Sequence, residues 1–171
     1  MAITSKQESI MANIATTLAN IDGTGNYNLD LSSNIWRIYR TPSDIPDDQF
    51  PCAMVVDDFD TLYMASTANE YTTGRAQQDV FDGWPVGILL YQKLATDAAL
   101  TGTLQTSLIN AFSDITIAML ADPKRGGNAL STVLHSSSKL AEWRDSAGFG
   151  TLGMVFIIKY DFNPTASTPV T

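Results

Sequence analysis

Apolar residues recur along the chain with two spacings, which predict helices in two places and strands between them. Near the N-terminus they recur every three or four positions, which predicts a helix with one apolar face. These residues are Ile10, Met11, Ile14, Leu18 and Ile21. Ser5 and Glu8 form a capping box at its start. Gly23 and Gly25 predict its end, because glycine adopts the left-handed cap conformation at little cost.

A second, longer helix is predicted by another set of apolar residues that share one face. They are Leu104, Leu108, Ala111, Phe112, Ile115 and Met119. Thr96 or Thr101 is expected to cap its start. Asp122 ends it, because the ring of Pro123 disfavours helix at the preceding residue.

Segments rich in β-branched and aromatic residues predict the strands. They are 35–40, 53–59, 84–92 and 152–162, with a less regular strand at 129–135. The centre of 53–59 is apolar on both faces, which is typical of a central strand. Serines 136–138 and residues 145–150 are interpreted as breaks, and residues 60–82 as an exposed excursion between strands.

This order predicts one α+β domain over residues 1–162, followed by a flexible tail at 163–171. We expect a mostly antiparallel sheet of about four to six strands packed against two main helices. The length of 171 residues fits a single domain.

The composition favours a protein that contacts other proteins. Charged residues make up 16% of the chain, below the roughly 25% of an average domain. A charge-poor surface costs less to desolvate in an interface, although a merely Ser/Thr-rich surface explains the value equally well. The net charge of −8 argues against a phosphate-binding surface.

Candidate catalytic residues are few. The single cysteine, Cys52, opens an apolar run and is interpreted as a buried structural thiol rather than a nucleophile. The single histidine, His135, is interpreted as a structural residue at a strand end rather than a base. Asp57, Asp58 and Asp60 are interpreted as a solvated strand end rather than a cation site.

One glycine pattern resembles a nucleotide-binding loop but stands in the wrong context. Residues 148–153 align with G-x-G-x-x-G, yet they precede a strand instead of following one and opening a helix. We therefore expect a protein without enzymatic activity, cofactor or metal, which acts by docking to other chains.

The layout of elements carries a family resemblance. A strand at 86–92 enters a long amphipathic helix, which closes on the turn 120–127. A glycine-broken segment then leads to the final strand at 153–160, and 35–40 followed by 51–59 forms a first strand pair. This order resembles the tail terminator, or tail completion, proteins of long-tailed bacteriophages.

The resemblance implies a role in the assembly of the virion. Such proteins form a homohexameric ring on the tail tube, stop its growth and present a docking surface to the head-side connector or stopper protein. A terminal sheath ring is a further partner where a sheath is present. DNA passes through the lumen, where an acidic chain would repel phosphates. The alternatives are a neck adaptor, a tail-tube subunit, or a small hydrolase or metal-dependent enzyme.

We expect the protein contacts in the turn after the long helix, in the 60–82 excursion and in the tail. The residues expected to make these contacts are Asp122, Pro123, Lys124, Arg125, Gly126, Gly127, Tyr71 and Arg75.

Overall fold

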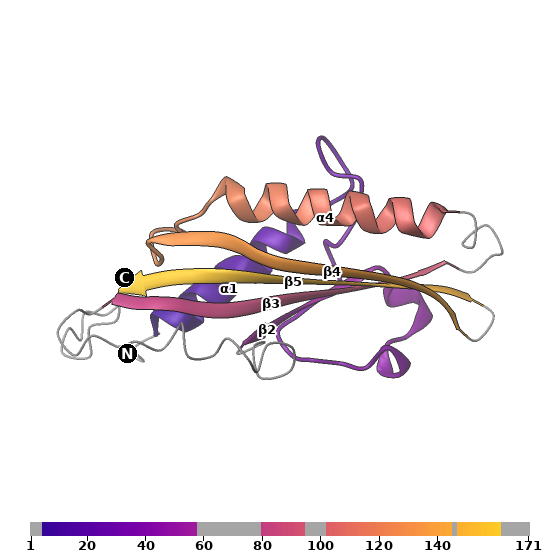
Figure 1. The fold of residues 1–171 in the computed structure, drawn as a ribbon, viewed down its shortest axis with the longest axis horizontal. Coiled ribbons are helices and arrows are strands. Elements are labelled where there is room, and N and C mark those ends of the chain that lie inside the picture. The colour runs from indigo at the N-terminus through magenta and orange to yellow at the C-terminus, as the bar shows by residue number, and fades with distance from the viewer. Residues whose placement is uncertain (1–4, 58–79, 95–101, 145–146, 162–171) are drawn as a thin grey trace.

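The computed structural model describes residues 5–57, 80–94, 102–144 and 147–161. Within these ranges, two α-helices and a five-stranded sheet form an α+β fold (Figure 1). The elements are α1 (Lys6–Ala19), β1 (Ile35–Trp36), η1 (Pro42–Asp44), η2 (Asp47–Gln49), β2 (Cys52–Asp57), β3 (Val80–Leu94), α4 (Thr103–Ala121), β4 (Ser131–Arg144) and β5 (Ala147–Asp161). The predicted tail at 163–171 and most of the predicted 60–82 excursion lie outside the described residues.

The sheet has the strand order β1-β2-β3-β5-β4. β1 pairs with β2 in parallel, and the other neighbours are antiparallel. The prediction of a mostly antiparallel sheet with two main helices is therefore confirmed. β2 lies inside the sheet between β1 and β3, as its apolar centre predicted.

The start of α1 follows the predicted capping box. The backbone N–H of Glu8 donates to the Ser5 side chain over 3.1 Å. The helix ends at Ala19, earlier than expected, and Gly23 and Gly25 shape the turn that follows with φ angles of 71° and 63°.

The start of α4 differs from the prediction. Gly102, with a φ angle of 83°, occupies the cap position and offers no side-chain hydrogen bond. The two threonines proposed as caps, Thr96 and Thr101, lie outside the described residues. The C-terminal end agrees with the prediction, because the helix stops at Ala121, just before the Asp122–Pro123 pair.

The pairing of β3 with β5 forms the centre of the sheet. It runs from Val80 opposite Asp161 to Leu94 opposite Gly148. Apolar side chains alternate between the two faces of β5: Met154, Phe156 and Ile158 lie on one face, and Val155 and Ile157 lie on the other. Both faces of the sheet therefore need a cover.

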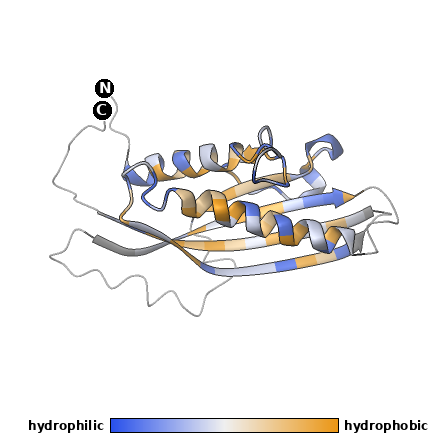
Figure 2. Cartoon of the chain, turned by 90° about the horizontal axis from the view of Figure 1, so that it is seen from above, coloured by the Kyte–Doolittle hydropathy of each residue, from blue (hydrophilic) through white to orange (hydrophobic). Residues whose placement is uncertain are grey.

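Helices α1 and α4 cover the first face (Figure 2). α4 approaches the sheet closely at Gly150, where an added Cβ would lie 3.0 Å from a methyl group of Leu104 and 3.1 Å from one of Leu108. This contact explains a glycine in a pattern that resembled a phosphate loop. The predicted break at 145–150 is wrong for residues 147–150, which belong to β5.

Asp114 fixes α4 to the connection between α1 and β1. Its side chain is fully buried. Its carboxyl oxygens accept from the backbone N–H groups of Asn28 and Leu29 and from the Asn28 amide, over 2.7, 2.9 and 3.0 Å. Buried polar groups are costly when they lack partners, so these bonds hold the connection in place.

The second face is covered by the chain between β1 and β2. Ile45 is buried there against the apolar side chains of Cys52, Met54, Leu89, Tyr91, Phe149 and Val155. The Phe50 and Phe149 rings meet edge to face, with centroids 6.0 Å apart. Residues 37–50, which include the short 3-10 helices η1 and η2, therefore cover this half of the sheet.

The predicted strand at 35–40 is wrong after Trp36, where β1 ends. Arg37 leaves the strand to form a two-pronged ion pair with Glu8, at 2.6 and 2.7 Å. The guanidinium of Arg40 lies 4.6 Å from the centroid of the Trp36 ring. These side-chain contacts replace strand pairing and leave Ile38 and Tyr39 exposed.

Replacing Asp114 with alanine is expected to destabilise the fold by about 3 kcal/mol, because three donors lose a buried acceptor. The free energy of unfolding in urea measures this loss. Ser113→Ala, at the exposed neighbouring position, is the control and should change stability by less than about 0.5 kcal/mol. Equal effects of the two substitutions would contradict the role of Asp114.

Burial raises the pKa of the Cys52 thiol to about 12, because the thiolate would lose its solvation. In the native protein at pH 8, this thiol should react with Ellman's reagent only at the rate at which the fold opens. In denaturant, where the thiol is exposed, the reaction should be immediate.

The folded pKa of Cys52 lies above the ordinary value of 9.0. The stability from the buried neutral thiol is therefore complete below pH 9 and is lost as the pH rises toward 12. Cys52→Ala should lack this alkaline loss, and rapid labelling of the native protein would contradict the burial.

Candidate assembly surface

β4 is an edge strand of unusual length. It spans Ser131–Arg144 and pairs with β5 on one side, while no described strand pairs with its other side. The predicted break at serines 136–138 is wrong, since the strand runs through them with a register irregularity between Leu134 and Ser136. An open edge offers a row of backbone donors and acceptors that can pair with another chain.

Apolar side chains on β4 extend the second face beyond its cover. Val133 stands opposite Ile157, and Leu140 stands opposite Thr151. Directly opposed residues share a face, so both lie on the side that carries Val155. Val133 is 56% exposed and Leu140 is 54% exposed. Residues 37–50 therefore cover the middle of the second face but leave Val133 and Leu140 on β4 uncovered.

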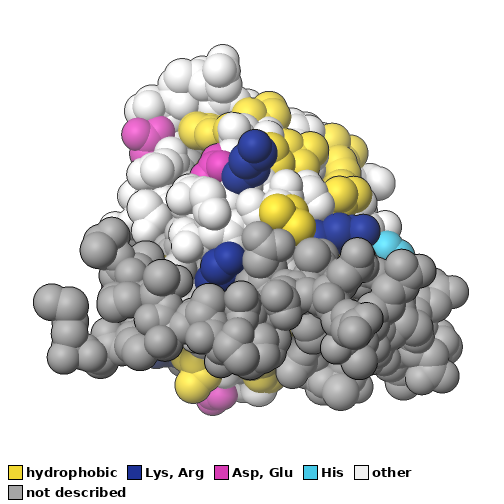
Figure 3. Space-filling model, turned by 90° about the vertical axis from the view of Figure 1, so that its left-hand side faces the viewer, with side chains coloured by type: hydrophobic (Ala, Val, Ile, Leu, Met, Phe, Trp, Pro, Cys, Tyr) yellow, Lys and Arg dark blue, Asp and Glu magenta, His cyan; other side chains and the backbone are white. Residues whose placement is uncertain are grey.

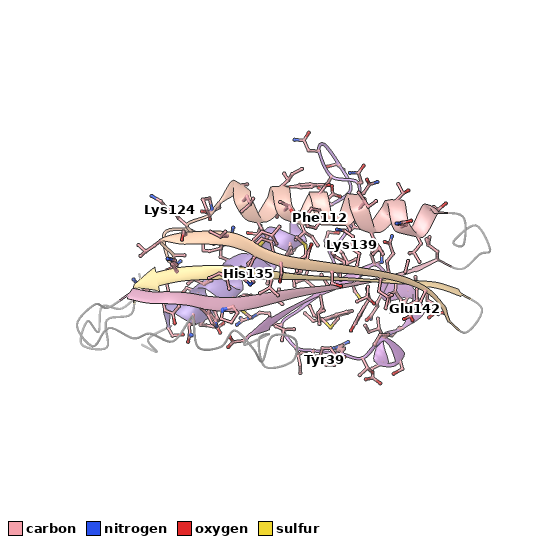
Figure 4. The ribbon with its side chains drawn as sticks, in the orientation of Figure 1. Tyr39, Phe112, Lys124, His135, Lys139 and Glu142 are labelled. Atoms are coloured by element: carbon pink, nitrogen blue, oxygen red, sulfur yellow. The ribbon has the colours of Figure 1, made fainter. Side chains whose placement is uncertain are left out.

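The outer side of α4 adds further apolar surface. Ile109, Ile117 and Leu120 are about half exposed. α4 and β4 are linked by Lys139, whose ammonium lies 4.0 Å from the centroid of the Phe112 ring (Figure 4). Figure 3 shows hydrophobic side chains gathered beside Lys and Arg at the end of the molecule where α4 finishes.

We call this region the β4–α4 surface. It consists of Ile109, Ile117, Leu120, Lys124, Leu130, Val133, Lys139 and Leu140, all exposed. Scattered exposed apolar residues are ordinary on a monomer. Val133 and Leu140 flank the open edge on the second face of the sheet, and Lys139 and α4 flank it on the first. Exposed apolar residues on both sides of an open edge make this region a candidate interaction site.

The turn after α4 lies at one end of this surface. Some of its predicted contact residues are exposed, whereas others are bonded within the turn or buried. The Asp122 carboxyl accepts from the backbone N–H groups of Lys124 and Gly126, over 3.2 and 2.6 Å. Pro123, Lys124, Gly126 and Gly127 are exposed, so they stay candidates for contacts. The prediction for Tyr71 and Arg75 concerns residues outside the described ranges.

Arg125 needs a correction, because its side chain is fully buried and unavailable to a partner in this structure. Its Nε donates to the Thr132 hydroxyl over 3.1 Å, and that hydroxyl donates to the Pro123 carbonyl over 2.9 Å. Burial lowers the pKa of Arg125, and the nearby Asp122 opposes this shift. Arg125 therefore holds the turn from inside, with a left-handed φ angle of 50°.

The residues considered for catalysis do not converge. His135 lies exposed within β4 at the register irregularity, so its prediction as a strand-end residue is wrong. Asp57 accepts from the buried indole N–H of Trp84 over 2.7 Å, while Asp58 and Asp60 lie outside the described residues. In the described part of the chain, no three His, Cys, Asp or Glu side chains are grouped to hold a metal ion.

Replacing Arg125 with alanine should destabilise the protein by about 2–4 kcal/mol, since the turn loses a buried side chain and its bond to Thr132. Lys124→Ala, at the exposed neighbour, should change stability by less than about 0.5 kcal/mol. Urea denaturation of both variants provides the comparison. The reverse order of effects would contradict the structural role of Arg125.

Comparisons with known proteins leave the family open. No family model matches the chain, and no curated protein matches it. Neither described helix is long and apolar enough to cross a membrane.

Proposed function

We propose that this chain is a structural protein of the bacteriophage virion: a tail terminator that forms a ring on the tail tube and ends its growth. The observation that carries the proposal is the β4–α4 surface, where a long open edge strand lies beside exposed apolar side chains. A protein that works by ring assembly needs such a surface on each copy. Full burial of one Val or Leu side chain contributes about 1.5–3 kcal/mol, so a few suffice to drive association.

Two further features support the proposal. Among the described elements, α1, the pair β1 and β2, the strand β3, the long helix α4 and the final strand β5 follow each other in the order on which the resemblance rests. Where that order has a glycine-broken segment before the final strand, this chain has β4 and the start of β5. The net charge of −8 suits a ring through which DNA slides, because phosphates are repelled rather than bound. The head-side connector would then dock on the exposed side of the ring.

The purified chain should form a closed oligomer of defined mass by native mass spectrometry. Added to assembling tail-tube protein, it should shorten the tubes and occupy one end of each in electron micrographs. A strict monomer that leaves tube length unchanged would contradict the proposal. Self-polymerisation into long tubes would replace it with a tube subunit, and binding to head connectors but not tubes with a neck adaptor.

A pair of variants connects this outcome to the β4–α4 surface. Val133→Lys with Leu140→Lys places charge in the exposed apolar layer and should abolish the oligomer while leaving the melting temperature of the monomer unchanged. Ala12→Lys with Thr16→Lys adds the same charge at exposed positions of α1 and is the matched control. Loss of assembly in both variants would point to net charge rather than to the surface.

A further inference from the structure

The segment that covers the second face of the sheet carries another surface of a different kind. Immediately after β1, Ile38 and Tyr39 are 63% and 47% exposed. Asp44, Asp47 and Asp48 follow and are exposed as well. The 38–48 segment is our name for these five exposed residues, Ile38, Tyr39, Asp44, Asp47 and Asp48. The segment crosses the second face of the sheet, where Ile45 packs against Leu89 and Val155 and Asp47 pairs with Lys93 of β3, whereas β4 forms an edge of the sheet. Figure 4 shows Tyr39 on the face of the sheet away from α4, and Lys139 between the sheet and α4.

The 38–48 segment presents a net negative charge to the outside, because Arg37 and Lys93 are paired with carboxylates and the remaining aspartates outnumber Arg40, which keeps its charge. Arg37 is paired with Glu8, and Arg40 lies over the Trp36 ring. Lys93 is paired with Asp47 at 2.6 Å. Asp48 has no ionic partner among the residues that the structure describes, and Asp44 accepts only from the Thr41 hydroxyl there.

The β4–α4 surface carries the opposite sign. Lys124 and Lys139 belong to it, and the exposed Lys159 of β5 stands opposite the first residue of β4. The acids on this side are Asp122, which is bonded into its turn, and the half-buried Glu142. The β4–α4 surface thus combines apolar side chains with an excess of lysine, whereas the 38–48 segment combines apolar side chains with an excess of aspartate.

From this arrangement we infer that a second copy of the chain docks head to tail, its 38–48 segment resting on the β4–α4 surface of its neighbour. Two β4–α4 surfaces facing each other would bring lysine against lysine, and two 38–48 segments would bring aspartate against aspartate. Like charges juxtaposed across an interface cost several kcal/mol. The heterologous contact alone matches opposite charges and buries both apolar sets.

Such a contact repeats in one direction and forms a ring when its rotation closes. The inference rests on the proposed ring assembly and names the surfaces that build it. Each copy then uses both surfaces, its 38–48 segment toward one neighbour and its β4–α4 surface toward the other. The tube and connector would then meet the ring through other faces.

Charge reversal tests the pairing. Lys124→Glu with Lys139→Glu makes both surfaces negative, and Asp44→Lys with Asp48→Lys makes both positive. Each double variant alone should assemble at least about tenfold more weakly than the parent by analytical ultracentrifugation. Mixed in equal amounts, the two should recover the parent assembly with alternating copies, because each mutated surface then meets its complement. Lys124→Arg with Lys139→Arg keeps the charge and should assemble normally.

The outcomes separate this inference from the proposed function. If the parent caps tubes as a ring and both double variants do so equally well, the ring is real and the assigned surfaces are wrong. If the Asp44/Asp48 variant assembles normally while the lysine variant does not, the contact does not use the 38–48 segment. A mixture that stays dissociated while each variant remains folded by circular dichroism overturns the head-to-tail pairing. A parent that never assembles contradicts the proposed function itself.

Discussion

The sheet at the centre of this protein is apolar on both faces, and the rest of the structure follows from that constraint. β3 and β5 pair along their whole length, and their side chains enter two separate hydrophobic clusters. Each Å² of apolar surface that stays in water lacks the roughly 25 cal/mol of stabilising free energy that burial would provide. Two layers are therefore required, and the chain supplies α1 with α4 for one face and residues 37–50 for the other. The second layer does not extend to Val133 and Leu140 on β4.

Apolar burial and charge would play different parts in assembly. Exposed ion pairs contribute only about 0–1 kcal/mol each, so the lysines and aspartates of the two surfaces are too weak to hold a ring together. Apolar contact provides the affinity, and charge selects the orientation by penalising the symmetric alternatives. The low share of charged residues agrees with this division, because few charges need to be desolvated.

The sequence predicted the elements whose periodicity reflects burial. α1, α4, β2, β3 and β5 appeared as expected, because their apolar residues repeat at 3.6 or 2 positions and face a core. Asp114 was overlooked, although it lies three residues after Ala111 and four before Ala118, on the buried side of α4. That spacing was a readable signal for a buried carboxyl.

The errors concern residues whose structure depends on partners distant in the sequence. Serines 136–138 lack the composition of a strand, yet they belong to β4 because the backbone of β5 lies beside them. Ile38 and Tyr39 have that composition but stay outside the sheet, because β1 ends at Trp36. Arg125 was predicted to be exposed because a polar turn surrounds it, and only the fold reveals Thr132 beneath. For the candidate surface, the sequence located the turn after α4 but gave no sign of the open edge of β4.

Hydrogen–deuterium exchange on the parent protein, compared between dilute monomer and assembled ring, tests most directly whether the edge of β4 is an interface. The account predicts that the amides of Ser131–Arg144 that point away from β5 exchange rapidly in the monomer and become protected in the ring, together with residues 38–48. Rapid exchange of β4 in a fully assembled ring, with new protection confined to other elements, would contradict it.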